Sequence, residues 1–320
     1  MAGQKFTVGH EAPLLVYLYE IYPGKSKTSV KNMLSKGQVL LNDAAVTAFD
    51  TPLKSGDVVT VLPKGISIAR SMKADARQDV LKAGVNILYE DADYLIAEKP
   101  SGMLCISTGS SAREKTLYSI LNAYVKMSAR MQRKEDLISG VAPDRSTAKV
   151  WIVHRLDKGT SGAVVFAKNE RAKDILQSKW KELVAERKYV AWLEGTLESD
   201  KGAVQSWLLE NPKSLKMVSY PEEVKDGQLA ITHYKVLKRT RYFTEVEFSL
   251  ETGRKNQIRV HAASELGHPV SGDDKYGAET NPIRRLALHA HTLVFRHPFT
   301  GKMVRCTSPL PESFSRFENH

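Results

Sequence analysis

The chain has 320 residues and a formal net charge of +11, so it is long enough for two domains, and its surface field favours a polyanionic partner such as nucleic acid. Its two cysteines, Cys105 and Cys306, lie far apart and outside any C-x-x-C pair, which excludes a disulfide framework and a thiolate zinc site and favours the cytoplasm. The apolar run at residues 12–19 is too short for a membrane span, and nothing beside it suggests export.

Residues 13–62 predict a small α/β unit. An apolar stretch, LLVYLYEIY, is followed by KSKTSVKNMLSKG and then by the strand-like runs QVLLND and SGDVVTVLP. In the second segment Ser26 or Thr28 can cap a helix, and Gly37 can end it. Such a helix would bury one face, because three apolar residues recur at helical spacing: Val30, Met33 and Leu34.

Four lysines surround this predicted helix: Lys25, Lys27, Lys31 and Lys36. They form either a solvated lysine face or a surface that binds phosphates. The order of a helix, the KTSVK helix and two strands resembles the S-four RNA-binding fold. Many of its members carry Ser-Arg where this chain has Lys27-Thr28, so positive charge is kept but the two-pronged guanidinium is lost. The resemblance implies an RNA-binding domain over residues 1–64, with Lys27, Lys31 and Lys36 contacting RNA.

Residues 64–83 are charged and carry few large apolar side chains, which predicts an exposed linker; we place this linker at residues 65–84 and a second domain at 85–320. Strand-like runs dominate the second domain: VNILYED, DYLIAEKP, KVWIVHRL, GAVVFAK, RKYVAWLEG, AVQSWLL, ITHYKVLKR, FTEVEFSLE and LALHAHTLVF. Three segments predict helices, LYSILNAYVKMSARM, ERAKDILQSKWKEL and NQIRVHAASEL, and residues 134–148 predict a polar loop. The mix favours an α+β domain built on a mixed, largely antiparallel sheet.

The most informative stretch is VWIVHRLDKGTSGAVVFAK, at residues 150–168. Two apolar strands flank HRLDKGTSG, whose Gly159 and Gly162 permit a tight turn that can present Asp157 at the edge of the sheet. By turn chemistry alone, Asp157 is more often an ordinary turn residue. The longer string, HRLD followed by TSG and AVVFAK, closely resembles the central motif of RluA-type pseudouridine synthases, in which this aspartate is the essential carboxylate.

Three further blocks resemble the same family in the same order, over residues 85–310. They are IAEKPSGML, RKYVAWLEG and TGRKNQIRVHAASELGHPVSGDDKYG. The resemblance makes Tyr189 of the second block an active-site tyrosine, although by itself it could be an ordinary strand aromatic. In the third block it makes Arg259 the catalytic basic residue, and Arg254 and Gln257 substrate-binding residues.

The chain departs from the family pattern in two places. Asn256 stands where many members have histidine, and we expect altered local packing or RNA contact there rather than lost chemistry. The loop MLCISTGSS lacks a His-Pro that is common in the family, which affects substrate contacts around residues 105–110.

The implied reaction breaks the N-glycosidic bond of a uridine, turns the uracil and rejoins it through carbon 5, so no cofactor is required. Asp157 would act as nucleophile or base, with Arg259 as its counter-charge. Tyr189 would stack on the uracil and offer its hydroxyl for proton transfer. Because the base must first leave its stack, Arg155 would enter the vacated space. The alternative for Arg155 is a surface ion pair. For His154 a structural role fits better than a catalytic one.

Arg259 is expected to point toward Asp157. Ile258, Ala262 and Leu266 recur at helical spacing and can anchor one helix face, while Arg259 projects from an adjoining one.

Other classes of protein fit less well. His289 and His291 alternate on a predicted strand without an acidic partner at ligand spacing, so no metal site is predicted. A non-catalytic RNA-binding or ribosome-assembly factor and a hydrolase that releases uracil remain as rivals. We therefore expect a pseudouridine synthase acting on ribosomal RNA or transfer RNA, without cofactor, membrane or obligate protein partner, and monomeric.

Overall fold

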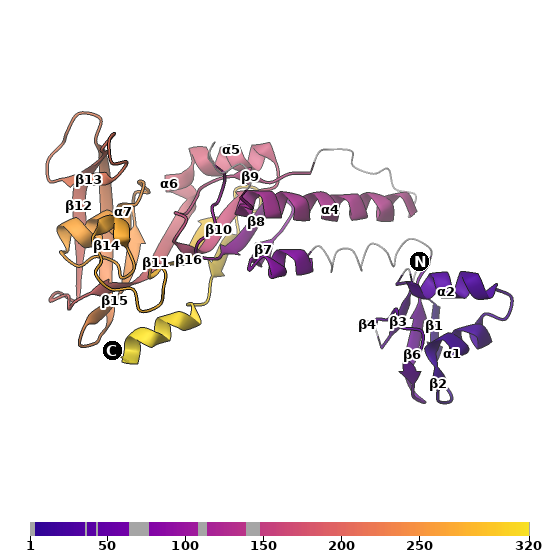
Figure 1. Ribbon diagram of the computed structural model, residues 1–320. Helices are drawn as coiled ribbons and strands as arrows, with labels where there is room; N and C mark the ends of the chain where they lie inside the picture. The colour runs from indigo at the N-terminus through magenta and orange to yellow at the C-terminus, as the bar shows by residue number, and fades with distance from the viewer. Residues whose placement is uncertain are drawn as a thin grey trace. The chain divides into compact units, whose positions relative to one another are not determined.

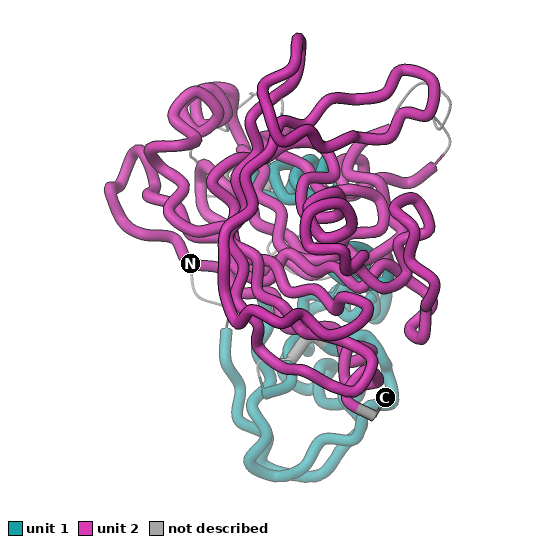
Figure 2. Tube along the Cα trace, turned by 90° about the vertical axis from the view of Figure 1, so that its left-hand side faces the viewer, with its two compact units in different colours: residues 1–82, 122–148 teal, residues 83–121, 149–320 magenta. Residues whose placement is uncertain are grey.

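The computed structural model describes residues 4–35, 37–42, 44–63, 77–107, 114–138 and 148–319 (Figure 1). The chain divides into two compact units, residues 1–82 with 122–148 and residues 83–121 with 149–320 (Figure 2). Most of the predicted linker, residues 64–76, lies outside the described ranges. Among the helices of those ranges, none is both long enough and apolar enough to span a bilayer.

The first unit pairs two helices with a small sheet, in the order that its sequence predicted. The helices are α1 (Leu14–Ile21) and α2 (Lys27–Ser35). The sheet has the order β1-β6-β3-β4, with strands β1 (Gln4–Thr7), β6 (Val58–Val61), β3 (Val39–Leu41) and β4 (Ala44–Ala45). A separate pair joins β2 (Ala12–Pro13) to β5 (Pro52–Leu53). The four-residue β1 was not predicted, because so short a run carries too little periodicity.

Helix α2 begins and ends as its sequence suggests. Ser26 Oγ accepts a hydrogen bond of 3.2 Å from the Ser29 N–H, so Ser26 and not Thr28 is the N-cap. Gly37 follows the helix with a φ of 64°, in the left-handed region that glycine adopts without cost. The apolar face is buried in the core of the unit, where Val30, Met33 and Leu34 pack with residues of α1.

The second unit contains an eleven-stranded sheet of order β13-β12-β14-β15-β11-β16-β10-β8-β7, with β17 paired to β16 and β9 paired to β10. Its strands are β7 (Asn86–Glu90), β8 (Tyr94–Lys99), β9 (Trp151–Ile152), β10 (Ser161–Ala167), β11 (Val184–Glu194), β12 (Lys201–Glu210), β13 (Met217–Tyr220), β14 (Gln228–Arg239), β15 (Phe243–Leu250), β16 (Leu288–Arg296) and β17 (Met303–Thr307). Among the described strands only β10 and β16 run parallel, which confirms the predicted mixed, mostly antiparallel sheet. The short β13 and β17 were missed.

Helices flank this sheet. Figure 1 shows α5 (Glu170–Ser178) and α6 (Trp180–Leu183) beside the strands around β10. Asn169 caps α5, since its side chain accepts a hydrogen bond of 2.8 Å from the Ala172 N–H. The predicted helix NQIRVHAASEL is α7 (Gln257–Val260) continued by a π-helical turn (His261–Glu265), and a C-terminal 3₁₀ segment spans Glu312–Asn319. The largest core joins β11, β15 and α7, around Trp192, Phe248 and Ile258.

Helix α4 (Leu117–Ile138) corrects one prediction. It extends five residues into the stretch 134–148 that was predicted as a loop, and residues 139–147 lie outside the described ranges. The stretch opens with KEDLI, whose residues suit an exposed helical turn as well as a loop, so polarity alone misplaced the boundary.

The parallel contact between β10 and β16 explains one glycine of the HRLDKGTSG motif. Gly162 pairs with Ala290 and has a φ of +112°. A Cβ at this position would lie 2.2 Å from the Ala290 carbonyl oxygen, so any other residue would push the strands apart. This close approach seats the turn that carries Asp157 directly against the centre of the sheet.

Candidate active site

The turn around Asp157 is held by the segment that follows β8. Lys99 is fully buried, and its ammonium donates to the carbonyl oxygens of Lys158 at 3.0 Å, of Pro100 at 2.9 Å and of Met103 at 2.7 Å. Burial lowers the pKa of Lys99 to about 8. The IAEKPSGML block therefore forms the support of the HRLDKGTSG turn, which gives a physical reason for their occurrence together.

Arg259 lies between two carboxylates. Its Nη1 donates to Asp157 Oδ2 at 3.1 Å, while its Nε and Nη2 donate to the two oxygens of Asp273 at 2.6 Å each. Burial would lower the pKa of Arg259, but the hydrogen bonds and negative charges of Asp273 and Asp157 outweigh it and raise the pKa above its ordinary value. The guanidinium is a permanent positive charge beside Asp157.

Asp273 was not among the residues singled out from the sequence. Its side chain has no exposed surface, and it stands in the GDDKYG string at the end of the third family block. The GDDKYG string could have identified Asp273 from the sequence. It belongs to the same block as Arg259, and a buried carboxylate needs a cationic partner of this kind.

Asn256 also touches Asp157. Its Nδ2 donates to Asp157 Oδ2 at 2.5 Å, so this departure from the family pattern lies within the site itself. Asp157 Oδ2 thus accepts two hydrogen bonds, whereas Oδ1 accepts none from the residues that the structure describes. Within the described residues, therefore, hydrogen bonds hold one oxygen of the carboxylate and leave the other free.

Tyr189 lies on β11 at a point where its pairing with β16 shifts register between Lys188 and Tyr189. Such irregularities redirect side chains, and Tyr189 lines the same cavity as Asp157. Burial raises the pKa of Tyr189 to about 12, although the charge of Arg187 opposes the shift. The phenol keeps its proton at neutral pH, and its hydroxyl has no hydrogen bond within the described ranges.

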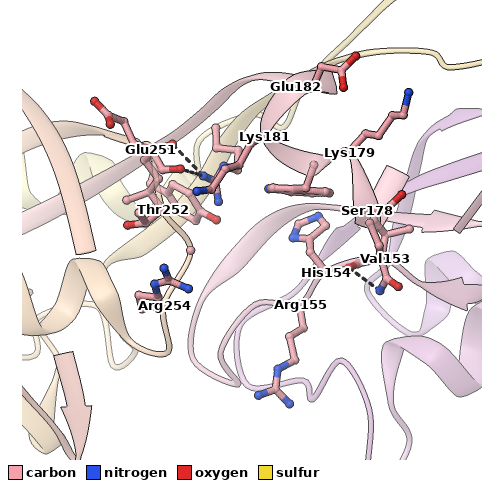
Figure 3. A pocket seen from close by; sticks show the side chains of 16 residues that line it. Val153, His154, Arg155, Ser178, Lys179, Lys181, Glu182, Glu251, Thr252 and Arg254 are labelled. Carbon is pink, nitrogen blue, oxygen red and sulfur yellow. Dashed lines mark hydrogen bonds between the residues drawn. The ribbon is translucent and has the colours of Figure 1, made fainter. Parts of the chain in front are cut away.

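Two cavities meet at this site. The smaller, of about 70 Å³, is lined by residues that include Asp157, Tyr189, Asn256 and Arg259. The larger, of about 680 Å³, opens beside it between α5–α6 and the segment after β15 (Figure 3). Four residues line both: Arg155, Tyr189, Leu250 and Arg254.

Positive charge prevails around the larger cavity. Five cationic residues line it: Arg155, Lys179, Lys181, Arg187 and Arg254. The acidic residues in the same lining are Glu182 and Glu251. Arg187 donates to the backbone oxygens of Leu250 and Glu251 at 2.9 Å each, so it closes one wall. An anion that entered this cavity would meet more positive than negative partners.

Arg155 and His154 behave differently although they are neighbours. Arg155 is exposed, and its guanidinium forms no hydrogen bond or ion pair with the described residues; in Figure 3 it extends away from His154. His154 accepts a hydrogen bond of 3.1 Å from the Val165 N–H and packs against Trp180. Burial, together with the charge of Arg187, lowers the pKa of His154 to about 3. It is a neutral structural histidine, as expected.

The remaining residues predicted to bind RNA differ in whether their side chains are available to it. The Arg254 Nε donates to the Leu229 carbonyl oxygen at 2.9 Å, which leaves its other N–H groups available in the cavity. Gln257 lines the smaller cavity but is buried, and its amide bonds within the protein to Thr252, Arg254, Ile231 and Thr232. We therefore assign Gln257 to holding the loop. Lys27 and Lys31 are exposed on α2 of the first unit, and Lys36 lies outside the described residues.

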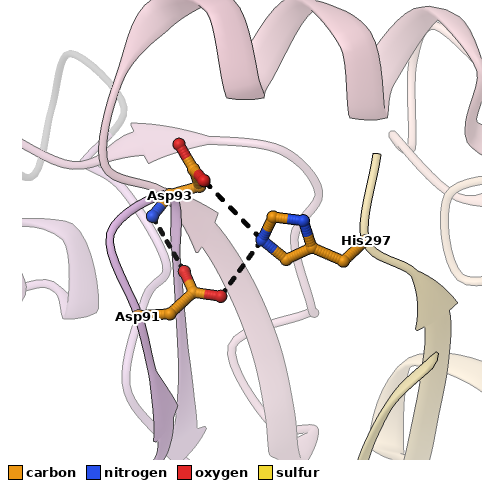
Figure 4. A group of neighbouring side chains, drawn as sticks. All are labelled: Asp91, Asp93 and His297. Atoms are coloured by element: carbon orange, nitrogen blue, oxygen red, sulfur yellow. Dashed lines mark hydrogen bonds and ion pairs between the residues drawn. The ribbon is translucent and has the colours of Figure 1, made fainter. Parts of the chain in front are cut away.

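A second polar cluster joins Asp91, Asp93 and His297 (Figure 4). His297 Nε2 lies 3.1 Å from an oxygen of Asp91 and 3.7 Å from one of Asp93. His297 Nδ1 accepts from two backbone N–H groups, those of Phe299 and Thr300, at 3.2 Å each. Nδ1 is therefore unprotonated and Nε2 carries a proton, which favours donation to Asp91 over coordination of a metal. The cluster ties the end of β16 to the β7–β8 turn.

Comparison with known proteins agrees with this geometry. The family model of RNA pseudouridylate synthase matches residues 93–264. A protein of Bacillus subtilis named uncharacterized RNA pseudouridine synthase YlyB is 35% identical over 91% of this chain and 88% of its own length. A protein of Xanthomonas campestris named ribosomal large subunit pseudouridine synthase D is 31% identical over 93% of this chain and 86% of its own length.

Solved structures share the fold. Human RNA pseudouridylate synthase domain containing 4 has a TM-score of 0.56 and 22% identity, covering 80% of this chain and 97% of its own. The ordered motifs, the position of Asp157 in the turn before β10 and the relatives matched over most of their length all agree. The chain belongs to the RNA pseudouridylate synthase family and is an isomerase that acts on RNA.

Proposed function

We propose that the protein converts uridines to pseudouridine in structured RNA, with ribosomal RNA as the first candidate substrate and transfer RNA as the second. The printed names of several relatives, from Xanthomonas campestris and Haemophilus ducreyi among others, support ribosomal RNA. One observation carries the assignment of chemistry: Asp157 has one oxygen held by Arg259 and Asn256 and a second oxygen free of hydrogen bonds from the described residues.

The reaction balances without a cofactor. The bond from uracil N1 to ribose C1′ breaks, a bond from C5 to C1′ forms, and one proton leaves C5 while N1 gains one. A carboxylate can act as a nucleophile at the sugar or at the base, or as a base at the sugar. Arg259 supplies its counter-charge, with Nη1 3.1 Å from Asp157 Oδ2. We assign this role to Asp157.

Tyr189 and Arg155 act on the base rather than on the bond. Tyr189 offers a ring on which uracil can stack, and its pKa of about 12 suits hydrogen-bond donation better than removal of a proton by the resting enzyme. Arg155 is exposed and forms no hydrogen bond or ion pair with the residues that the structure describes, so its planar guanidinium is available to occupy the space that the extruded base leaves.

The larger cavity receives RNA next to the target. It shares Arg155, Tyr189 and Arg254 with the smaller cavity, so a strand whose uridine reaches Asp157 must pass its opening. The excess of cations along its wall suits the phosphates of that strand.

Residues 1–64 form an S-four-like RNA-binding domain in this proposal, followed by a linker at 65–84 and the catalytic domain at 85–320. The two helices packed on a small sheet, with Lys27 and Lys31 exposed on α2, support it. Lys36 completes the proposed set of contacts. The enzyme acts as a monomer in this proposal, since all residues of the candidate site come from one compact unit of one chain. The proposed compartment is the cytoplasm, which the two free cysteines favour.

The decisive test compares the wild type with Asp157→Asn on RNA transcripts, measuring both pseudouridine and free uracil. Asparagine keeps the shape of the side chain but is no nucleophile, so we expect no detectable turnover with normal folding and RNA binding. Release of free uracil by the wild type would identify a hydrolase. No product with intact RNA binding would identify a binding factor, and substantial turnover by Asp157→Asn would overturn the role of Asp157.

A further inference from the structure

Asn256 is anchored from behind as well as bonded to Asp157. Its Oδ1 accepts hydrogen bonds from Tyr276 Oη at 3.1 Å and from Lys275 Nζ at 3.3 Å. Both donors come from the short 3₁₀ segment Asp274–Tyr276. Because the oxygen of the amide is occupied by two donors, the NH₂ group is the end that faces Asp157. The direction of the amide is thus determined by groups outside the catalytic turn.

The backbone of Asn256 is adapted to this position. Its φ is 53° and its ψ is 21°, in the left-handed region, and its side chain is buried. Asparagine tolerates this region better than most residues with a side chain. The conformation places the amide at the start of α7, three residues before Arg259, so one short helix presents both donors to Asp157 Oδ2.

From this geometry, and resting on the proposed function, we propose that Asn256 is a positioning residue for the catalytic carboxylate. Asn256 and Arg259 together immobilise Oδ2, and Tyr276 and Lys275 hold the amide that does so. Oδ1 is consequently the oxygen that reacts. Asn256 performs this role where many members of the family carry histidine, a residue that can also donate an N–H and also tolerates the left-handed region.

Asn256→Gly tests the proposal, because glycine adopts the same backbone conformation without strain while the amide is lost. A hydrogen bond to a charged group is strong enough that single-turnover release of tritium from 5-tritiated uridine in transcribed large-subunit ribosomal RNA should slow roughly 10- to 100-fold. RNA affinity should stay at the wild-type value, and thermal unfolding should show that the variant is still folded at the assay temperature despite the lost hydrogen bonds. Asn256→His should restore most of the rate, and Tyr276→Phe should slow it less, since Lys275 still donates.

The matched control is Asn42→Gly. Asn42 also has a left-handed backbone, with a φ of 49°, and its Nδ2 donates to a carboxylate, Asp57 Oδ1, at 2.9 Å. This variant should keep the single-turnover rate at saturating RNA.

A wild-type rate in Asn256→Gly overturns the positioning role while the proposed function stands. A loss of RNA affinity alone, or a rate that Asn256→His does not restore, overturns it as well, because either result assigns Asn256 to RNA contact or to local packing. Absence of tritium release by the wild type from both ribosomal RNA and transfer RNA transcripts overturns the proposed function and this inference together.

Discussion

Arg259 binds Asp273 more closely than it binds Asp157. Two hydrogen bonds of 2.6 Å join its Nε and Nη2 to Asp273, and one of 3.1 Å joins its Nη1 to Asp157. The Asp273 side chain has no exposed surface, whereas that of Asp157 is 29% exposed. The buried aspartate therefore fixes the guanidinium, which leaves one N–H directed at the carboxylate of the proposed chemistry.

Arg259→Ala should destabilise the fold as well as slow the reaction. Removing the cation leaves Asp273 charged and buried, which costs about 3–5 kcal/mol of unfolding free energy. Adding Asp273→Asn should recover part of that loss, because the unpaired charge is removed. Denaturant unfolding of the two single variants and the double variant measures the coupling. Strictly additive losses would contradict the pairing as the source of the instability.

Arg155→Ala should lower the single-turnover rate on structured RNA more than the rate on unstructured RNA. The side chain is exposed and forms no hydrogen bond or ion pair with the described residues, so folding should be unchanged. If it occupies the space of the extruded base, the single-turnover rate should fall on a folded stem and much less on a short unstructured strand. Equal losses on both substrates would point to a direct role in the chemical step.

Replacing Lys179 and Lys181 by glutamine should weaken RNA binding through electrostatics alone. Both are exposed at the wall of the larger cavity. Loss of two phosphate contacts should reduce the slope of log affinity against log salt by about two. Lys302→Gln, in the exposed turn between β16 and β17, is the control and should leave the slope unchanged. An unaltered slope in the double variant would place the RNA elsewhere.

Two buried histidines should make the second unit sensitive to acid. Burial lowers the pKa of His261 and of His289 from 6.5 to about 4. Both rings are neutral in the fold at neutral pH, so their contribution to stability is complete above pH 6.5 and is lost progressively as the pH falls from 6.5 to 4. At about pH 5 the loss is on the order of 2 kcal/mol for each. Denaturant unfolding across this range, with proton uptake on unfolding, measures it; flat stability between pH 7 and pH 5 would contradict the neutral rings.

Much of the architecture followed from local signals. Period-two alternation marked most strands of the second unit, and the apolar spacing of Val30, Met33 and Leu34 marked α2. Short or ambiguous elements were not predicted correctly. The four-residue β13 carries too little pattern, and the polar end of α4 resembles a loop because exposed helix and loop share the same residues.

The sequence by itself determined the family and the identity of the central aspartate, because contiguous strings such as HRLDKGTSG carry that information without distances. Only the tertiary structure decided how the carboxylate is held. Asn256 and Arg259 lie 99 and 102 positions from Asp157, and their hydrogen bonds to one shared oxygen depend on the turn after β8, the β10–β16 contact and the start of α7. Asp273 and Tyr276 do not touch Asp157 but hold its partners, since Asp273 binds Arg259 and Tyr276 binds Asn256. Such hydrogen bonds require side-chain positions accurate to about a few tenths of an ångström, which no spacing along a chain encodes.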